Sequence, residues 1–152
     1  MKVVMTLAVA LLLAGCFPAA AGEDEVGINV LHSLSFDYAT CAAYHLIFKQ
    51  CAPEGTPDEQ LALVQSWAEK AVDGMTISGE AAGMSDAALA AEQTLAVSEG
   101  MKLIENKCIN GSLLIVKYAD FCRDLEQNPT KRGLELCRQL AQNPERRAKC
   151  GG

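Results

Sequence analysis

The stretch 35–51, SFDYATCAAYHLIFKQC, constrains the fold of this chain more than any other segment. It holds four aromatic residues and two cysteines within seventeen positions. At the helical step of about 100° per residue, its apolar side chains spread around almost the whole circumference, and no broad face is left for water. A helix of this kind lies in the middle of a fold, so we expect the other segments to cover it.

The composition indicates that those covering segments are also helices. Half of the 152 residues are apolar but only 5% are aromatic, and the excess of alanine favours closely packed helices over strands. A chain of this length forms one domain. We therefore predict an all-α fold: a disulfide-tied up-down bundle of about four helices with a short C-terminal helical duplication.

The amino terminus has the pattern of a signal peptide. Lys2 precedes an apolar run over 3–13 that is too short to span a bilayer. The run ends in Leu-Ala-Gly-Cys, which resembles the bacterial lipobox and predicts lipidation of Cys16. Cleavage after the Ala-Ala-Ala at 19–21 is the alternative, and it would remove Cys16 from the mature chain.

These signals divide the chain into four parts: a signal peptide over 1–15, a tether over 16–32, the helical bundle over 33–126, and a basic helical extension over 127–152. The tether is assigned because it is rich in small and acidic residues and shows no apolar periodicity.

Capping residues predict where the bundle helices begin. We expect Ser33 or Ser35 to cap the central helix, and Thr56 to open the next one through a capping box with Glu59. Glycines predict a turn over 76–84, after which Ser85 caps a third helix.

A fourth helix is expected after the Asn-Gly turn at 110–111, with Ser112 as its cap. Helical spacing predicts that its buried face includes Leu114, Ile115, Tyr118 and Cys122.

Without Cys16, six cysteines remain, an even number that suits an oxidising compartment. Cys41 and Cys51 cannot pair, because ten helical residues separate them by about 15 Å while bridged Cα atoms lie within about 7 Å. In an up-down bundle the first and fourth helices are antiparallel neighbours. This topology favours three pairs: Cys41 with Cys122, Cys51 with Cys108, and Cys137 with Cys150.

The C-terminal extension begins with a duplication. FCRDLEQNPTKR at 121–132 and LCRQLAQNPERR at 136–147 are identical at seven of twelve positions. Each copy contains Asn-Pro, which reads as a helix cap followed by a first-turn proline.

The duplication also places cations where a helix disfavours them. Lys131, Arg132, Arg146 and Arg147 fall in first turns, where the helix dipole disfavours each by about 0.3 to 1 kcal/mol. Residues 1–116 carry fourteen acids and five bases, whereas residues 117–152 carry five acids and eight bases. One hypothesis is a basic rim that binds an anionic envelope component or an acidic protein. In the alternative, these cations pair with the acidic part of their own chain or only solubilise the surface.

Chemistry is constrained by the presence of only two histidines. His45 could be imagined as an acid-base pair with Tyr38 or Asp37, but a histidine in a mostly apolar helix is more often a packed residue with a local acceptor. The sequence contains no C-x-x-C, no glycine-rich phosphate loop and no serine-hydrolase elbow. We therefore predict no catalytic, cofactor-binding or metal-ligating residue, no cofactor and no nucleic-acid partner.

Together these features predict a non-enzymatic interaction or structural protein of the cell envelope. We expect a small bacterial lipoprotein that is held in the outer membrane only by its lipid anchor and is exposed to the periplasm or the exterior. A secreted inhibitor or effector, or an unrecognised envelope enzyme, is the alternative.

Overall fold

The computed structural model describes residues 24–141 and 144–150, and every regular element in that part of the chain is helical. The predicted all-α class is therefore confirmed. In chain order the elements are α2 (Asp24–Gln50), α3 (Asp58–Ala81), α4 (Asp86–Leu103), the short 3-10 helix η1 (Cys108–Asn110), α5 (Ser112–Gln127), α6 (Pro129–Leu140) and α7 (Pro144–Lys149). The predicted signal peptide and Cys16 lie outside the described residues.

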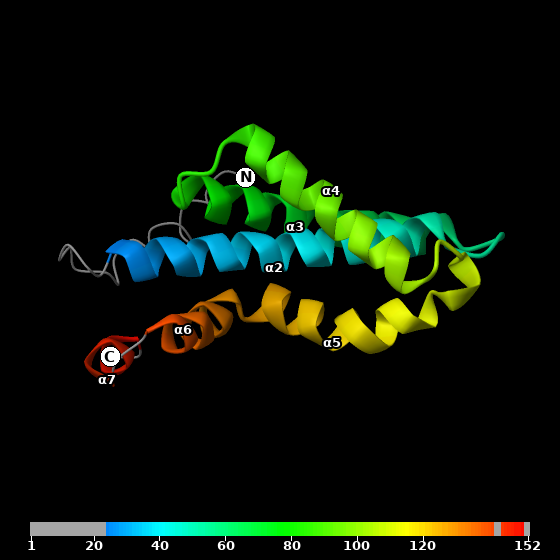
Figure 1. The fold of residues 1–152 in the computed structure, drawn as a ribbon. Coiled ribbons are helices and arrows are strands. Elements are labelled where there is room, and N and C mark those ends of the chain that lie inside the picture. Colours follow the sequence, from blue (N-terminus) through cyan, green and yellow to red (C-terminus); the bar gives the residue numbers. More distant parts are fainter. Residues whose placement is uncertain (1–23, 142–143, 151–152) are drawn as a thin grey trace.

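α2 occupies the centre of the molecule, as its apolar circumference predicts. It packs against α3, α4, α5 and α6, and Figure 1 shows it between α3 and α4 on one side and α5 and α6 on the other. Ala39, Cys41 and Ala42 are fully buried in its middle. A residue without a side chain in α3 lets that helix approach α2 closely. The ring of Tyr38 in α2 lies directly against Gly74 of α3, where an added Cβ would meet ring atoms at 2.6 Å.

The start of α2 differs from the prediction. The helix begins at Asp24, so residues 24–32 are helical and do not belong to a tether, and neither Ser33 nor Ser35 caps it. Val30 and Leu34, four residues apart, are buried against Leu136 and Cys137 of α6. Burial against a segment about a hundred residues away stabilises these turns, and the local sequence carries no sign of that partner.

α3 also departs from the prediction at both ends. The capping box is wrong: Thr56 Oγ1 donates to the Pro53 carbonyl at 2.7 Å, and Pro57 stands at the N-cap without a side-chain bond. Because the hydroxyl group of Thr56 is hydrogen-bonded within its own loop, it does not cap the helix. The expected turn over 76–84 is helical as far as Ala81.

Glycine explains why α3 continues and where it ends. Gly79 is buried because Leu89 of α4 and Ser35 of α2 pack directly onto it. The glycine therefore lets these two helices approach α3 closely and does not break the helix. The helix ends at Ala81, and Gly83, just beyond the C-cap Ala82, has a φ of +80° that suits glycine, while the Met84 amide donates to the Gly79 carbonyl at 2.9 Å. Ser85 then caps α4, as predicted, by accepting from the Ala88 amide at 3.3 Å.

Three disulfides tie the helices, and they are the pairs favoured by the helix geometry. Cys41–Cys122 joins the middles of α2 and α5, Cys51–Cys108 joins the end of α2 to η1, and Cys137–Cys150 joins α6 to the end of the chain. The first two bridges require α2 and α5 to run antiparallel, as they do in Figure 1.

α6 starts where the Asn-Pro signal predicts, with Asn128 at the N-cap and Pro129 in the first turn. It packs on the N-terminal half of α2, at the end of the molecule opposite to η1 (Figure 1). The two ends of α2 are thus covered by different parts of the chain.

Candidate functional site

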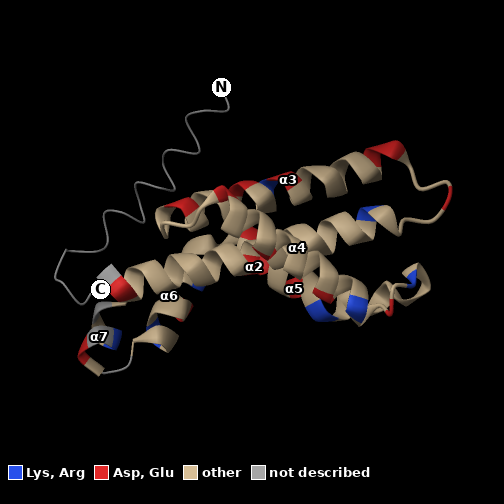
Figure 2. Cartoon of the chain, turned by 45° about the horizontal axis from the view of Figure 1, so that its top comes forward, with Lys and Arg blue, Asp and Glu red and all other residues tan. Residues whose placement is uncertain are grey.

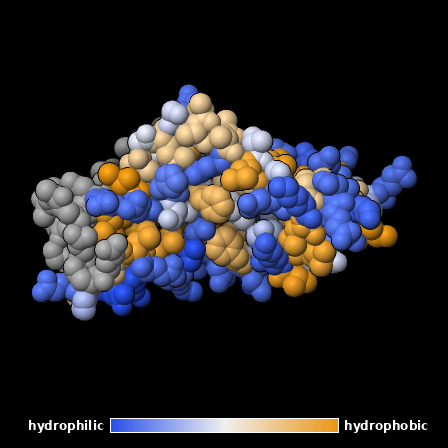
Figure 3. Space-filling model, viewed as in Figure 1, coloured by the Kyte–Doolittle hydropathy of each residue, from blue (hydrophilic) through white to orange (hydrophobic). Residues whose placement is uncertain are grey.

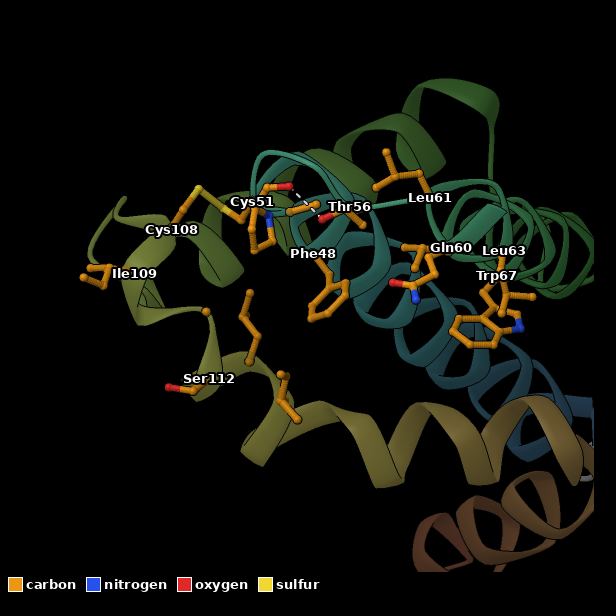
Figure 4. A pocket seen from close by; sticks show the side chains of 16 residues that line it. Phe48, Cys51, Thr56, Gln60, Leu61, Leu63, Trp67, Cys108, Ile109 and Ser112 are labelled. Atoms are coloured by element: carbon orange, nitrogen blue, oxygen red, sulfur yellow. Dashed lines mark hydrogen bonds between the residues drawn. A yellow bond between two sulfur atoms is a disulfide. The ribbon is translucent and has the colours of Figure 1, made fainter. Parts of the chain in front are cut away.

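An apolar groove lies where α2 ends and where α3 and α5 begin (Figure 4). α3 and α5 form its walls, Phe48 of α2 lies between them, and its volume is about 590 Å³. In Figure 4 the Cys51–Cys108 bridge lies at one end and Trp67 at the other. None of the sixteen described residues that line it is charged: Phe48, Cys51, Ala52, Pro53, Thr56, Gln60, Leu61, Leu63, Val64, Trp67, Cys108, Ile109, Gly111, Ser112, Leu114 and Ile115.

The groove and its rim expose large aliphatic side chains to solvent. Among the lining residues, Leu63 is 50% exposed, Ile115 is 44% exposed and Ile109 is 89% exposed; Val116, which follows Ile115 in α5 and does not line the groove, is 87% exposed. Figure 3 shows apolar surface gathered over the start of α5. A cluster of this kind is typical of an interaction site, whereas scattered single apolar residues are ordinary.

The backbone before α5 explains why Ile109 protrudes. Glu105 and Asn106 adopt left-handed conformations, with φ of 54° and 56°, and turn the chain sharply after α4. Asn110 Nδ2 donates to the Ile104 carbonyl at 3.1 Å, and the Cys51–Cys108 bridge anchors the preceding residue. Ile109 is therefore held between two fixed neighbours and points away from the core (Figure 4).

The groove corrects one part of the sequence analysis. Ile115 was predicted on the buried face of its helix, but it lies on the groove wall and only its neighbour Leu114 is buried. A signal for this exposure exists in the run LLIV at 113–116: four consecutive residues cover a whole helical turn and cannot all face one core.

His45 is buried near the groove, and its partner is Glu126. His45 Nε2 and Glu126 Oε1 lie 2.8 Å apart, and the imidazole ring centroid is 5.6 Å from that of Trp67. Tyr38 and Asp37, the partners considered from the sequence, do not pair with it among the described contacts. Burial first, and the charge of Glu126 second, raise the pKa of both Tyr38 and Tyr44.

One cation of the predicted basic rim, Arg132, is bound to its own chain. Arg132 Nε donates to Asp37 Oδ2 at 2.8 Å, its guanidinium lies 3.6 Å from Glu135, and it stands over the Phe121 ring at 5.4 Å. Burial raises the pKa of Asp37 more than Arg132 lowers it, and the hydrogen bond from Arg132 to Asp37 raises the pKa of the guanidinium.

The other three cations of the rim differ in their surroundings. Lys131 is exposed, and Arg147 is exposed while its Nε donates to the Ala141 carbonyl at 3.0 Å. The side chain of Arg146 lies outside the described part of the structure. For Arg132, at least, the alternative of pairing with the acidic part of the same chain applies.

No protein-family model matches this sequence, and no curated protein or solved structure shows significant similarity to it. Within the described ranges, no helix is both long and apolar enough to cross a bilayer, and no group of three His, Cys, Asp or Glu side chains could hold a metal ion.

Proposed function

We propose that this chain is a non-enzymatic interaction protein of the bacterial cell envelope that binds its partner through the apolar groove between α3 and α5. The observation that carries the proposal is the groove itself: an uncharged concavity with Phe48 and Trp67 inside it and strongly exposed aliphatic residues on its rim. Aromatic and aliphatic side chains in a water-accessible pocket are the usual centre of a protein interface.

Export and lipid anchoring are part of the same proposal. The lipobox-like sequence ending at Cys16 supports a lipoprotein in the outer membrane, facing the periplasm or the exterior. Three disulfides support an oxidising compartment, because such bridges persist outside the cytosol. Mass spectrometry of the mature amino terminus tests this part: a diacylated Cys16 supports it, and an unmodified chain that begins near Gly22 favours a secreted inhibitor or effector.

Site-specific photo-crosslinking in cells tests the groove. A photoreactive residue at Leu63 should give discrete adducts, because this side chain is half exposed within the groove. The matched control is Leu95 of α4, which is 49% exposed and does not line the groove. Equal adducts at both positions, or none at Leu63, would reject the groove as the binding surface.

The basic extension is a second proposed surface, for an anionic envelope component or an acidic protein. What supports it is the exposure of Lys131 and Arg147 at positions that the helix dipole disfavours. A contact of this kind weakens as salt rises, whereas an apolar contact in the groove does not. The salt dependence of each captured partner therefore assigns it to one surface or the other.

A further inference from the structure

We infer that the occupant of the groove is a second copy of this chain, so that the protein forms a two-fold symmetric dimer through the groove end. This inference rests on the proposed function, because it names the partner of the same groove. It is drawn from the shape of the surface and from the charges on its two walls.

The surface contains both a cavity and a projection that could fill one. The groove is open beside Phe48, and Ile109 projects from its rim with 89% of its area exposed. In a two-fold interface one patch must supply both complementary parts, since residue i of one copy contacts residue j of the other and the reverse. Here Ile109 of each copy would enter the groove of its partner, and Val116 would extend the contact.

The two walls carry opposite charges outside the uncharged lining. Residues 52–60, at the start of the α3 wall, contain Glu54, Asp58 and Glu59 and no lysine or arginine. Residues 107–117, at the start of the α5 wall, contain Lys107 and Lys117 and no acid, and Glu105, just before them, pairs with Lys107. Figure 2 shows acidic residues at the start of α3 and basic residues around the start of α5. A two-fold axis along the groove sets the α3 wall of each copy against the α5 wall of the other, so that unlike charges face each other.

The structure leaves these charges accessible. Glu54, Asp58, Glu59 and Lys117 are exposed, and the side chain of Lys107 is 66% exposed in a 3.7 Å pair with Glu105. Unlike Arg132 at the other end, they are not committed to a buried contact.

The first experiment measures self-association of the exported chain, carrying Cys16→Ser so that no lipid contributes, by sedimentation velocity over a wide concentration range. We expect a monomer–dimer equilibrium and expect Ile109→Asp to weaken it by about tenfold or more, because a charged carboxylate would replace an apolar side chain in the contact. Leu95→Asp on α4 is the matched control and should leave it unchanged. Far-ultraviolet circular dichroism and thermal melting establish that each variant is folded.

The second experiment exchanges the charges. Glu54→Lys with Glu59→Lys makes both walls basic, and Lys107→Glu with Lys117→Glu makes both walls acidic, so each double variant should self-associate more weakly than the original chain. A mixture of the two should form a heterodimer, which only a copy-to-copy contact predicts.

The outcomes separate the two proposals. A chain that stays monomeric, or a dimer that is insensitive to Ile109→Asp, overturns the self-association. If Leu63 still gives crosslinks to a different envelope component, the groove keeps its proposed function. If Leu63 gives no crosslinks at all, both proposals fail.

Discussion

The two ends of this molecule differ in which side chains are paired inside the fold and which are left exposed to solvent. At the basic end, formed by α6, α7 and the first half of α2, one of the clustered cations makes an internal contact: Arg132 pairs with Asp37 and packs over the ring of Phe121. At the groove end, formed by the last turn of α2 and the starts of α3 and α5, apolar side chains are left in solvent. Each end is closed by its own disulfide, so the difference does not come from loose structure. A conspicuous pattern in a sequence can thus mark an internal contact, while the accessible surface is made by residues that look like ordinary core.

The bridge between the two ends has the largest expected effect on stability. Replacing Cys41 and Cys122 by alanine should lower the free energy of unfolding by about 3 to 5 kcal/mol, because a cross-link and two fully buried side chains are lost together. The measurement is urea unfolding at neutral pH.

The bridge at the groove end is the matched control. Replacing Cys51 and Cys108 by alanine removes a cross-link with a sequence separation of 57, nested within the separation of 81 that Cys41–Cys122 closes, but Cys108 is exposed. We expect a loss of about 2 to 3 kcal/mol. Equal losses for both bridges would mean that burial of Cys41 and Cys122 adds nothing.

Next in size is the ion pair at the basic end. Arg132→Gln should cost about 1 to 3 kcal/mol at pH 7, because it leaves the mostly buried carboxylate of Asp37 without its cation. The pKa of Asp37 is already raised by burial above 3.8, and removal of Arg132 raises it further. Since the folded variant binds this proton more tightly than the unfolded chain does, its deficit should be full at neutral pH and shrink as pH falls through the raised pKa.

Thermal melting of the variant between about pH 4 and pH 7 checks this prediction. Lys131→Gln, a neighbouring change at an exposed position, should stay within about 0.5 kcal/mol of the original protein. A deficit for Arg132→Gln that grows as pH falls would contradict the assignment of Asp37 as its partner.

A smaller effect is expected at the buried pair between the two ends. Glu126→Gln keeps a hydrogen-bonding group near His45 but removes the charge, which should cost about 1 kcal/mol. It should also lower the pKa of Tyr38 and Tyr44 toward their ordinary value, since the charge of Glu126 helps to raise both. Tyrosinate absorbance during alkaline titration measures the shift, and Asp124→Asn, at an exposed neighbouring position, should not produce it.

The smallest effects are expected in the groove. Leu63→Gln and Ile109→Gln should each change the free energy of unfolding by no more than about 0.5 kcal/mol, because Leu63 is already half exposed and Ile109 is almost fully exposed. Leu125→Ala, at a buried position of α5, should cost about 2 to 5 kcal/mol. If the groove substitutions destabilised the protein as strongly as the core substitution, the groove would be part of the core and not an interaction surface.

Some features of this protein follow from its sequence alone. The alanine-rich composition determined the helical class, Ser85 and Asn128-Pro129 marked helix starts, and the rise of a helix excluded a Cys41–Cys51 bridge and so narrowed the pairing. These inferences succeed because propensity, capping and helical rise act over a few residues.

Other features were decided only by tertiary structure. α2 begins at Asp24 because Val30 and Leu34 meet α6, and α3 continues past Gly79 because α2 and α4 pack onto that glycine. Arg132 is paired inside the fold and not left free for a partner because it meets Asp37, ninety-five residues away in the sequence. The groove exists because α3 and α5 lie on either side of Phe48 without packing closely on each other, which exposes Ile115, a residue that helical periodicity alone assigns to a core. Burial depends on which distant segments meet, and a local pattern cannot encode that.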